Sequence, residues 1–183
     1  MRRYIFTGAP GAGKSTLLGA LSDRGYPVVP EAATDVIALQ QAKGILQPWT
    51  DAHFLTDILQ LQMVRQVGER TAPVVLFDRS PICTLSLARY LGHPIPPDLT
   101  REVERLVADR IYERVVFLVR PLGFIEPTAA RHITYEDALA FEAVHESTYD
   151  GLGFDLVEVL PGPVSSRAAT AHAAIAALDT QRT

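Results

Sequence analysis

The stretch Gly8-Ala9-Pro10-Gly11-Ala12-Gly13-Lys14-Ser15-Thr16 matches G-x-x-x-x-G-K-[ST], the Walker A pattern of a phosphate-binding P-loop. A short apolar run, Tyr4 to Thr7, precedes it, and apolar residues at helical spacing follow it as far as Leu21. The loop is therefore predicted to join a strand to a helix, which is the context that this motif requires. The alternative, a glycine-rich turn that binds nothing, does not explain that context.

Each residue type in this stretch suits the binding of a polyphosphate. The glycines let the backbone approach the phosphates with φ values that a Cβ would forbid. The loop amides and the start of the next helix direct N–H donors at the phosphates. Lys14 is expected to place its ammonium on the β and γ oxygens, and Ser15 its hydroxyl on Mg²⁺. The chain has 15 Arg but only two Lys, so a Lys here favours a site for a compact ammonium.

The composition is that of one ordinary globular domain. The chain has 183 residues, of which 48% are hydrophobic and 21% charged, and this suits a single α/β domain. A net charge of −4 provides no basic field, so nucleic acid is not expected as a partner. The single cysteine, Cys83, is expected to be a buried, inert thiol in a reducing compartment. No apolar run approaches the ~20 residues of a membrane span, so we expect a cytoplasmic protein. The sequence does not predict its oligomeric state.

Strands alternate with helices along the whole chain, which predicts an α/β fold. Strands are expected near residues 3–7, 26–29, 73–77, 115–119 and 155–160. Helices are expected near residues 14–23, 32–42, 50–70, 81–91, 99–112, 135–150 and 164–178, with Thr50 and Thr134 capping two of them. The prediction is a three-layer P-loop sandwich, in which a mostly parallel five-stranded sheet carries helices on both faces. Residues 1–183 are expected to form one domain with a lid at about 120–134.

Candidate functional residues follow the strands, where ligands of such sheets bind. Asp78 ends an apolar strand, as does the Walker B carboxylate that holds Mg²⁺; the alternative is a cap on the next helix. Arg79 stands where AAA-type hydrolases usually place a Glu that activates water. An Arg there favours phosphoryl transfer to an organic acceptor, with Arg79 binding a phosphate or the acceptor. The alternative for Arg79 is a surface salt bridge.

Two further positions are candidates for catalysis. Glu31 follows the second strand and is the first candidate for the carboxylate that takes the acceptor's proton, with Asp78 the second. The alternative for Glu31 is a favourable charge at a helix N-terminus. Arg120 and Arg131 bracket the connector after the fourth strand. Arg120 is a candidate phosphate or acceptor ligand, and Arg131 is the better candidate for stabilising the transition state; solvated loop arginines are the alternative.

Four blocks of sequence carry a resemblance to a known family. These blocks are Phe6 to Thr16, Val29-Pro30-Glu31-Ala32-Ala33, Phe77-Asp78-Arg79-Ser80, and Arg131 with the helix ending Tyr149-Asp150-Gly151-Leu152-Gly153. Together they resemble the small P-loop ATPase/kinase family related to the nicotinamide riboside kinase domain of NadR-type proteins. The resemblance spans nearly the whole chain and implies an AAA-type, NMP-kinase-like sheet, ATP and Mg²⁺. Nothing here resembles the adenylyltransferase domain of NadR-type proteins, so their second activity is not expected.

A second resemblance concerns the candidate base. A carboxylate after the second strand and Asp-Arg-Ser after the third are also found in deoxynucleoside kinases, where that carboxylate serves as the base. The resemblance implies this role for Glu31, with Arg79 beside it, and carries no further residue over.

The sequence thus predicts an ATP- and Mg²⁺-dependent phosphotransferase acting on a small hydroxyl-bearing acceptor, with a nucleoside as one candidate. One alternative is an ATPase, or a nucleotide-dependent switch, that acts on a protein partner. Another is a nucleotide-binding module without turnover. The chain contains no Asn, which excludes the N-K-x-D base-reading motif of most GTPases and favours ATP.

Overall fold

The computed structural model describes residues 1–68, 72–123 and 133–180. The strands are β1 (Arg2–Thr7), β2 (Val28–Val29), β3 (Val74–Asp78), β4 (Val115–Val119) and β5 (Asp155–Val159). The helices are α1 (Lys14–Ser22), α2 (Ala32–Ala42), α3 (Phe54–Val67), α4 (Pro81–Leu91), α5 (Pro97–Ala108), α6 (Tyr135–Gly151) and α7 (Val164–Thr180), with a 3₁₀ turn η1 at Pro48–Thr50. Every strand pairing is parallel, in the order β2-β3-β1-β4-β5. The predicted α/β fold is confirmed.

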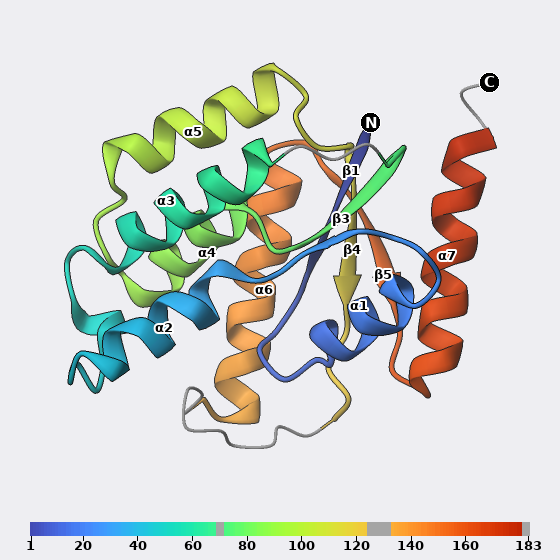
Figure 1. The fold of residues 1–183 in the computed structure, drawn as a ribbon. Coiled ribbons are helices and arrows are strands. Elements are labelled where there is room, and N and C mark those ends of the chain that lie inside the picture. Colours follow the sequence, from blue (N-terminus) through green and yellow to red (C-terminus); the bar gives the residue numbers. More distant parts are fainter. Residues whose placement is uncertain (69–71, 124–132, 181–183) are drawn as a thin grey trace.

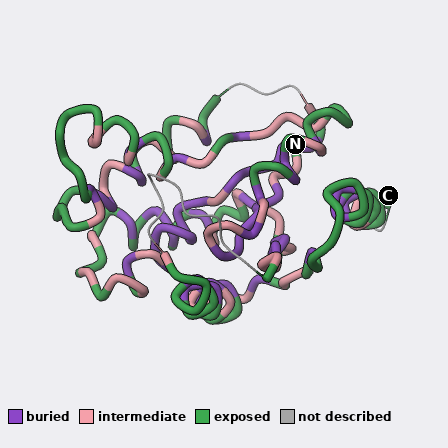
Figure 2. Tube along the Cα trace, turned by 90° about the horizontal axis from the view of Figure 1, so that it is seen from below, coloured by how far each residue is buried: buried purple, intermediate pink, exposed green. Residues whose placement is uncertain are grey.

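Helices cover both faces of the sheet (Figure 1). Successive side chains of a strand point to opposite faces, so Ile5 joins one apolar cluster, while Tyr4 and Phe6 join the other. The cluster around Ile5 contains residues of α3, α4, α5 and α6. The cluster around Phe6 contains residues of α1 and α7, and α2 packs beside α3 in a third cluster. The strands are buried between helices whose outer sides are exposed (Figure 2).

Two predicted helices differ by several residues from their bounds in the structure. The helix expected from Thr50 begins at Phe54 instead, because Thr50 belongs to η1 and its hydroxyl donates to Gln47 O at 2.8 Å. The helix expected over residues 99–112 is α5, which begins at Pro97 and ends at Ala108. Arg110, with φ of 50°, has a left-handed backbone conformation that ends the helical path. The predicted cap at Thr134 is confirmed, since its hydroxyl accepts from Asp137 N at 3.1 Å.

The strand order sets the positions of the candidate residues. β3 pairs with β1, which places Asp78 beside the strand that enters the P-loop. β2 lies one strand further out, so Glu31 is displaced to one side of the phosphate-binding loop. Asp78 therefore lies nearer to the P-loop strand than Glu31 does.

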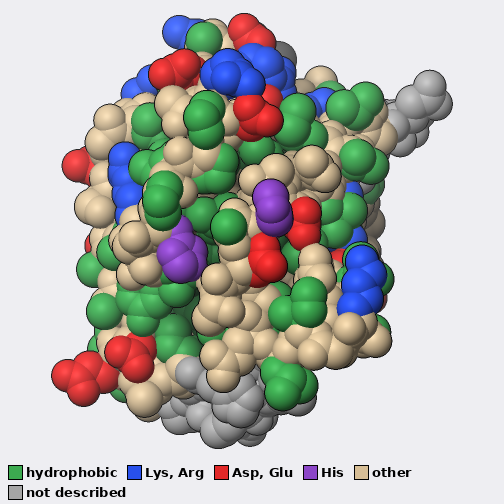
Figure 3. All heavy atoms as spheres, turned by 90° about the vertical axis from the view of Figure 1, so that its left-hand side faces the viewer, with side chains coloured by type: hydrophobic (Ala, Val, Ile, Leu, Met, Phe, Trp, Pro, Cys, Tyr) green, Lys and Arg blue, Asp and Glu red, His purple; other side chains and the backbone are tan. Residues whose placement is uncertain are grey.

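The surface opposite α7 mixes both signs of charge. Seen from the left-hand side of Figure 1, acidic and basic side chains lie next to one another among apolar and polar ones (Figure 3). Within the described ranges, no helix has the length and apolar character needed to cross a membrane.

Candidate active site

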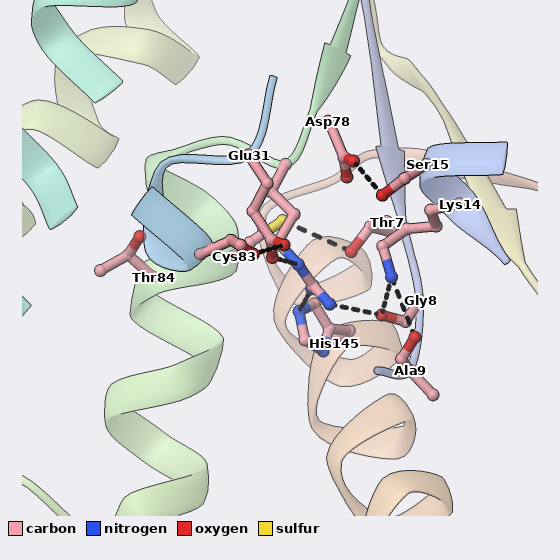
Figure 4. A network of polar contacts seen from close by, with 12 residues as sticks. Thr7, Gly8, Ala9, Lys14, Ser15, Glu31, Asp78, Cys83, Thr84 and His145 are labelled. Carbon is pink, nitrogen blue, oxygen red and sulfur yellow. Dashed lines mark hydrogen bonds and ion pairs between the residues drawn. The ribbon is translucent and has the colours of Figure 1, made fainter. Parts of the chain in front are cut away.

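Lys14 is buried against the backbone of its own loop. The residue is 7% exposed, and its Nζ donates to Gly8 O at 3.2 Å and to Ala9 O at 2.9 Å (Figure 4). Burial, and then the neighbouring Arg79, lower the pKa of the Lys14 ammonium to about 8. Gly8 allows the loop to pass β4, because a Cβ there would lie 2.4 Å from Val119 O. Glycine at this position thus permits the close approach of the loop backbone to β4, whereas its approach to phosphates stays a prediction.

Asp78 and Ser15 form a candidate magnesium site. Ser15 Oγ donates to Asp78 Oδ2 at 3.2 Å, which joins the start of α1 to the end of β3. Asp78 is 6% exposed, and its Oδ1 has no hydrogen-bond partner among the described residues. Burial raises the pKa of the Asp78 carboxyl, and the nearby Glu31 raises it further. A buried carboxylate oxygen with spare acceptor capacity beside a hydroxyl suits a hard cation such as Mg²⁺.

Arg79 connects three parts of the site. Its Nε donates to Glu31 Oε1 at 2.5 Å, its Nη1 lies 3.0 Å from His145 Nε2, and its Nη2 donates to Gly8 O at 3.1 Å. The backbone of Arg79 is left-handed, with φ of 71°, a conformation that costs a non-glycine residue on the order of 1 kcal/mol or more. The side chain is 10% exposed, so the predicted alternative of a surface salt bridge does not describe it.

Glu31 is held as an ionised carboxylate. Thr34 Oγ1 donates to its Oε2 at 2.7 Å, and Arg79 holds its Oε1. Burial by itself raises the pKa of the Glu31 carboxyl, but Arg79 and then Lys14 outweigh burial and lower that pKa below its ordinary value. Glu31 stands at the N-cap position of α2, yet its side chain makes no capping hydrogen bond there. Thr34 belongs to the first turn of α2, whereas Arg79 ties Glu31 to the site.

His145 of α6 is a member of this network that the sequence analysis missed. The residue is fully buried, and its Nδ1 lies 3.0 Å from Phe141 O. A carbonyl oxygen only accepts and a guanidinium only donates, so Nδ1 carries the proton and Nε2 accepts from Arg79. The bond that Nε2 accepts from Arg79 requires a neutral ring, and burial, followed by Arg79, lowers the pKa of His145 well below its ordinary value. In Figure 4, the side chains of Glu31 and His145 lie close to one another.

Arg120 lies at the end of β4 among acidic side chains. Nη1 donates to Glu142 Oε1 at 2.7 Å and also bonds Glu146, while Nη2 donates to Glu158 Oε1 at 2.6 Å. Glu142 is buried and accepts from Ala9 N at 3.3 Å, so Arg120 reaches the P-loop through Glu142. Because Arg120 forms these ion pairs, the alternative of a solvated loop arginine does not describe it. A direct contact of Arg120 with a phosphate or acceptor remains a prediction.

Arg131 and most of the predicted lid, residues 124–132, lie outside the described residues.

One sequence signal could have marked the helix residues that complete the site as candidates. Glu142 and His145 share the buried side of α6 with apolar residues, and Arg167 does so on α7. A charged or polar residue in an apolar helical stripe is rarely buried without a partner, and this pattern marks a candidate for a polar network.

A small hollow of about 10 Å³, roughly the space of one water molecule, lies beside the network. It lies on the β2 side of Asp78 and Arg79, and its other walls include Pro30, Gln62 and Tyr112. The hollow therefore adjoins both the candidate magnesium ligand and the arginine that holds Glu31.

A family model described as an AAA domain matches residues 3–167. The chain belongs to this family. The match covers the P-loop, Glu31, Asp78 and Arg79, as well as α6 and the start of α7, where Arg167 lies. No curated protein matches the sequence.

Solved structures show the same fold as this AAA-domain chain. Deoxyadenosine kinase from M. mycoides, with dCMP and dCDP bound, is 15% identical with a TM-score of 0.66, and the similarity covers 96% of this chain and 99% of that one. The NadR protein in complex with NAD and AMP-PNP is 18% identical with a TM-score of 0.66, over 95% of this chain and 48% of NadR. NadR in complex with NR is 19% identical with a TM-score of 0.61, over 86% and 43%. The chain thus has the P-loop kinase fold, and the resemblance stated from its sequence is confirmed.

Proposed function

We propose that this AAA-domain protein is an ATP- and Mg²⁺-dependent phosphotransferase that phosphorylates a hydroxyl of a small acceptor, with a nucleoside as the first candidate. One observation carries the proposal: Arg79 joins the ionised carboxylate of Glu31 to Gly8 O of the P-loop. A charged carboxylate that is fixed beside the phosphate site suits a base that deprotonates an acceptor.

The phosphates of ATP are expected to lie on the P-loop. Backbone amides between Gly8 and Thr16 would donate to phosphate oxygens, and the Lys14 ammonium would move from its loop carbonyls to them. Ser15 and Asp78 would hold Mg²⁺, which supplies positive charge to the phosphates when it is bound. Arg120 and Arg131 stay proposed as further cations for the phosphates or acceptor.

Glu31 is the proposed general base. The acceptor's oxygen forms a bond to the γ-phosphorus as the bond from that phosphorus to the β–γ bridging oxygen breaks, leaving ADP. The proton of the acceptor hydroxyl passes to Glu31, whose lowered pKa keeps it unprotonated and ready at neutral pH. Arg79 keeps the carboxylate in place. The left-handed backbone conformation of Arg79 supports this role, because such a strained conformation persists only where surrounding contacts enforce it.

Two further facts favour a kinase over an ATPase or a switch. The residue after Asp78 is Arg79, which is engaged with Glu31 and cannot serve as a base toward water. The solved structures named above include a deoxyadenosine kinase with a nucleotide product and NadR with NR, so proteins of this fold bind nucleosides or nucleotides.

ADP release with and without acceptors tests this proposal. The purified chain would be supplied with ATP and Mg²⁺, alone and with a panel of nucleosides and sugars. Release that depends on one acceptor class is the expected result. Release at the same rate without any acceptor would instead identify an ATPase, and no release with any acceptor, together with tight ATP binding, would indicate a binding module.

A further inference from the structure

Arg167 lies against the outside of the P-loop. It belongs to α7, beside α1 (Figure 1), and it is 5% exposed. Its Nη1 donates to Ala12 O at 2.9 Å, and its Nη2 donates to Arg120 O at 3.0 Å. This one side chain therefore links α7 to the phosphate-binding loop and to the residue that follows β4.

The charge of Arg167 is poorly compensated within the described part of the chain. Arg79 and Arg120 each pair with carboxylates, whereas no carboxylate among the described residues forms an ion pair with Arg167. Its Nε is buried without a hydrogen-bond partner in the same ranges, and burial lowers the pKa of the guanidinium. A buried cation without a counter-ion is costly, and an anion bound nearby reduces that cost.

The contact with Ala12 O acts on one particular peptide group. Ala12 C=O and Gly13 N–H belong to the same planar trans peptide, so they point in opposite directions. When Arg167 holds the oxygen from outside, the N–H is directed away from Arg167. A hydrogen bond to a charged donor also polarises the peptide, which makes that N–H a stronger donor.

Gly13 fits the same arrangement. Its backbone is left-handed, with φ of 79°, and a Cβ at this position would lie 3.1 Å from Arg167 Nη1. The glycine thus serves two purposes, since it permits the turn of the loop and leaves room for the guanidinium behind it.

We propose that Arg167 is a positioning residue for the phosphate-binding loop, which fixes the Ala12–Gly13 peptide from outside and adds positive charge to the site of a bound polyphosphate. The proposal concerns the affinity for polyphosphate only. It holds whether the bound nucleotide serves a kinase, an ATPase or a binding module.

Affinity for AMP-PNP with Mg²⁺, measured by calorimetry on folded protein, tests the proposal. Arg167→Met keeps an unbranched apolar stem but removes both hydrogen bonds and the charge, and it should weaken binding by about ten- to a hundredfold. Arg167→Lys keeps the charge but cannot hold two carbonyls with a planar fork, so its loss should be smaller but measurable. Arg24→Met is the matched control, because Arg24 donates to Ala168 O at 3.4 Å from beyond the other end of α1.

The free energy of unfolding without nucleotide separates binding from folding in all three variants. If the role of Arg167 is only structural, replacing it should lower the free energy of unfolding but leave the affinity of the folded protein within twofold of that of the parent chain. This result would overturn the proposal. If Arg167→Met does not fold, Arg167→Lys decides. Binding by the lysine variant equal to that of the parent chain, or an equal loss in Arg24→Met, would contradict the positioning role.

Discussion

At the scale of single residues, Arg79 is the position on which the site depends most. A left-handed conformation in a non-glycine residue costs on the order of 1–3 kcal/mol and persists only when surrounding contacts enforce it. Here the enforcing contacts are the bonds from its side chain to Glu31, His145 and Gly8. The sequence predicts that Arg79 lies at the end of this strand. It does not predict the backbone conformation of Arg79, because that conformation depends on partners from three other parts of the chain.

The two carboxylates of the site should respond differently to loss of charge. Glu31→Gln should leave Mg²⁺–ATP binding nearly unchanged and reduce acceptor phosphorylation by about 10²–10⁴, the usual contribution of a general base. Asp78→Asn should weaken the Mg²⁺ dependence of nucleotide binding, because it removes a negative charge next to Ser15.

Titration of Mg²⁺ against nucleotide binding in both variants checks these roles, with Glu104→Gln on the exposed side of α5 as a control. A shifted metal dependence in Glu31→Gln and an unshifted one in Asp78→Asn would show that the two roles are reversed.

Lys14 offers a test of the P-loop itself. Lys14→Ala should abolish turnover and the stabilisation of the fold by ATP, because a charge-assisted contact with phosphate is worth ~1.5–3 kcal/mol in binding alone. Thermal unfolding with and without ATP and Mg²⁺ measures this effect. Lys43→Ala is the matched control, since Lys43 is the other lysine of the chain and is exposed. Turnover at the parent rate in Lys14→Ala would remove the loop from the mechanism.

At the scale of secondary-structure elements, α6 supplies two buried polar side chains to the site. His145 and Glu142 come from this helix, and they reach Arg79 and Ala9 N respectively. The sequence predicts α6 and its cap correctly, because helix periodicity and capping are local signals. Which residues of α6 meet the P-loop depends on how the helix is rotated and shifted against the sheet. That packing is not a local property, so the pattern of buried polar residues could mark Glu142 and His145 as candidates for a polar network but could not name their partners.

The buried His145 predicts a pH dependence of stability. The unfolded chain takes up a proton on this ring near pH 6.5, whereas the folded protein does so only at a lower pH, since its pKa is lowered. Below about pH 6.5 the unfolded state therefore binds more protons, and the free energy of unfolding falls with decreasing pH by up to ~1.4 kcal/mol per unit. Above that pH the ring is neutral in both states and contributes no slope.

Denaturant unfolding between pH 5.5 and 7.5 checks this prediction. His145→Gln keeps an acceptor for Arg79 but cannot be protonated, so the slope below pH 6.5 should be smaller than in the parent chain. His53→Gln, at an exposed position, should leave the slope unchanged. Equal slopes in the parent chain and His145→Gln would mean that His145 does not fold as a neutral ring.

At the scale of the whole molecule, the order of the strands determines what the sequence can predict. Parallel strands bring their carboxyl ends to one edge, so residues that follow strands could be placed together from the sequence alone. This holds for the P-loop, Glu31, Asp78 and Arg79. The identity of the acceptor could not be predicted, because it depends on side chains that meet from separate elements, as Gln62 of α3 and Tyr112 between α5 and β4 do beside Arg79.

The fate of the γ-phosphoryl group tests the central claim most directly. ATP with a labelled γ-phosphate would be incubated with the chain, Mg²⁺ and the acceptor that best stimulates ADP release, and the products separated and identified by mass spectrometry. The account predicts that the label is found on a hydroxyl of the acceptor, in an amount equal to the ADP formed, and that Glu31→Gln forms far less of this product. Label recovered only as inorganic phosphate, at a rate that no acceptor changes, would contradict it.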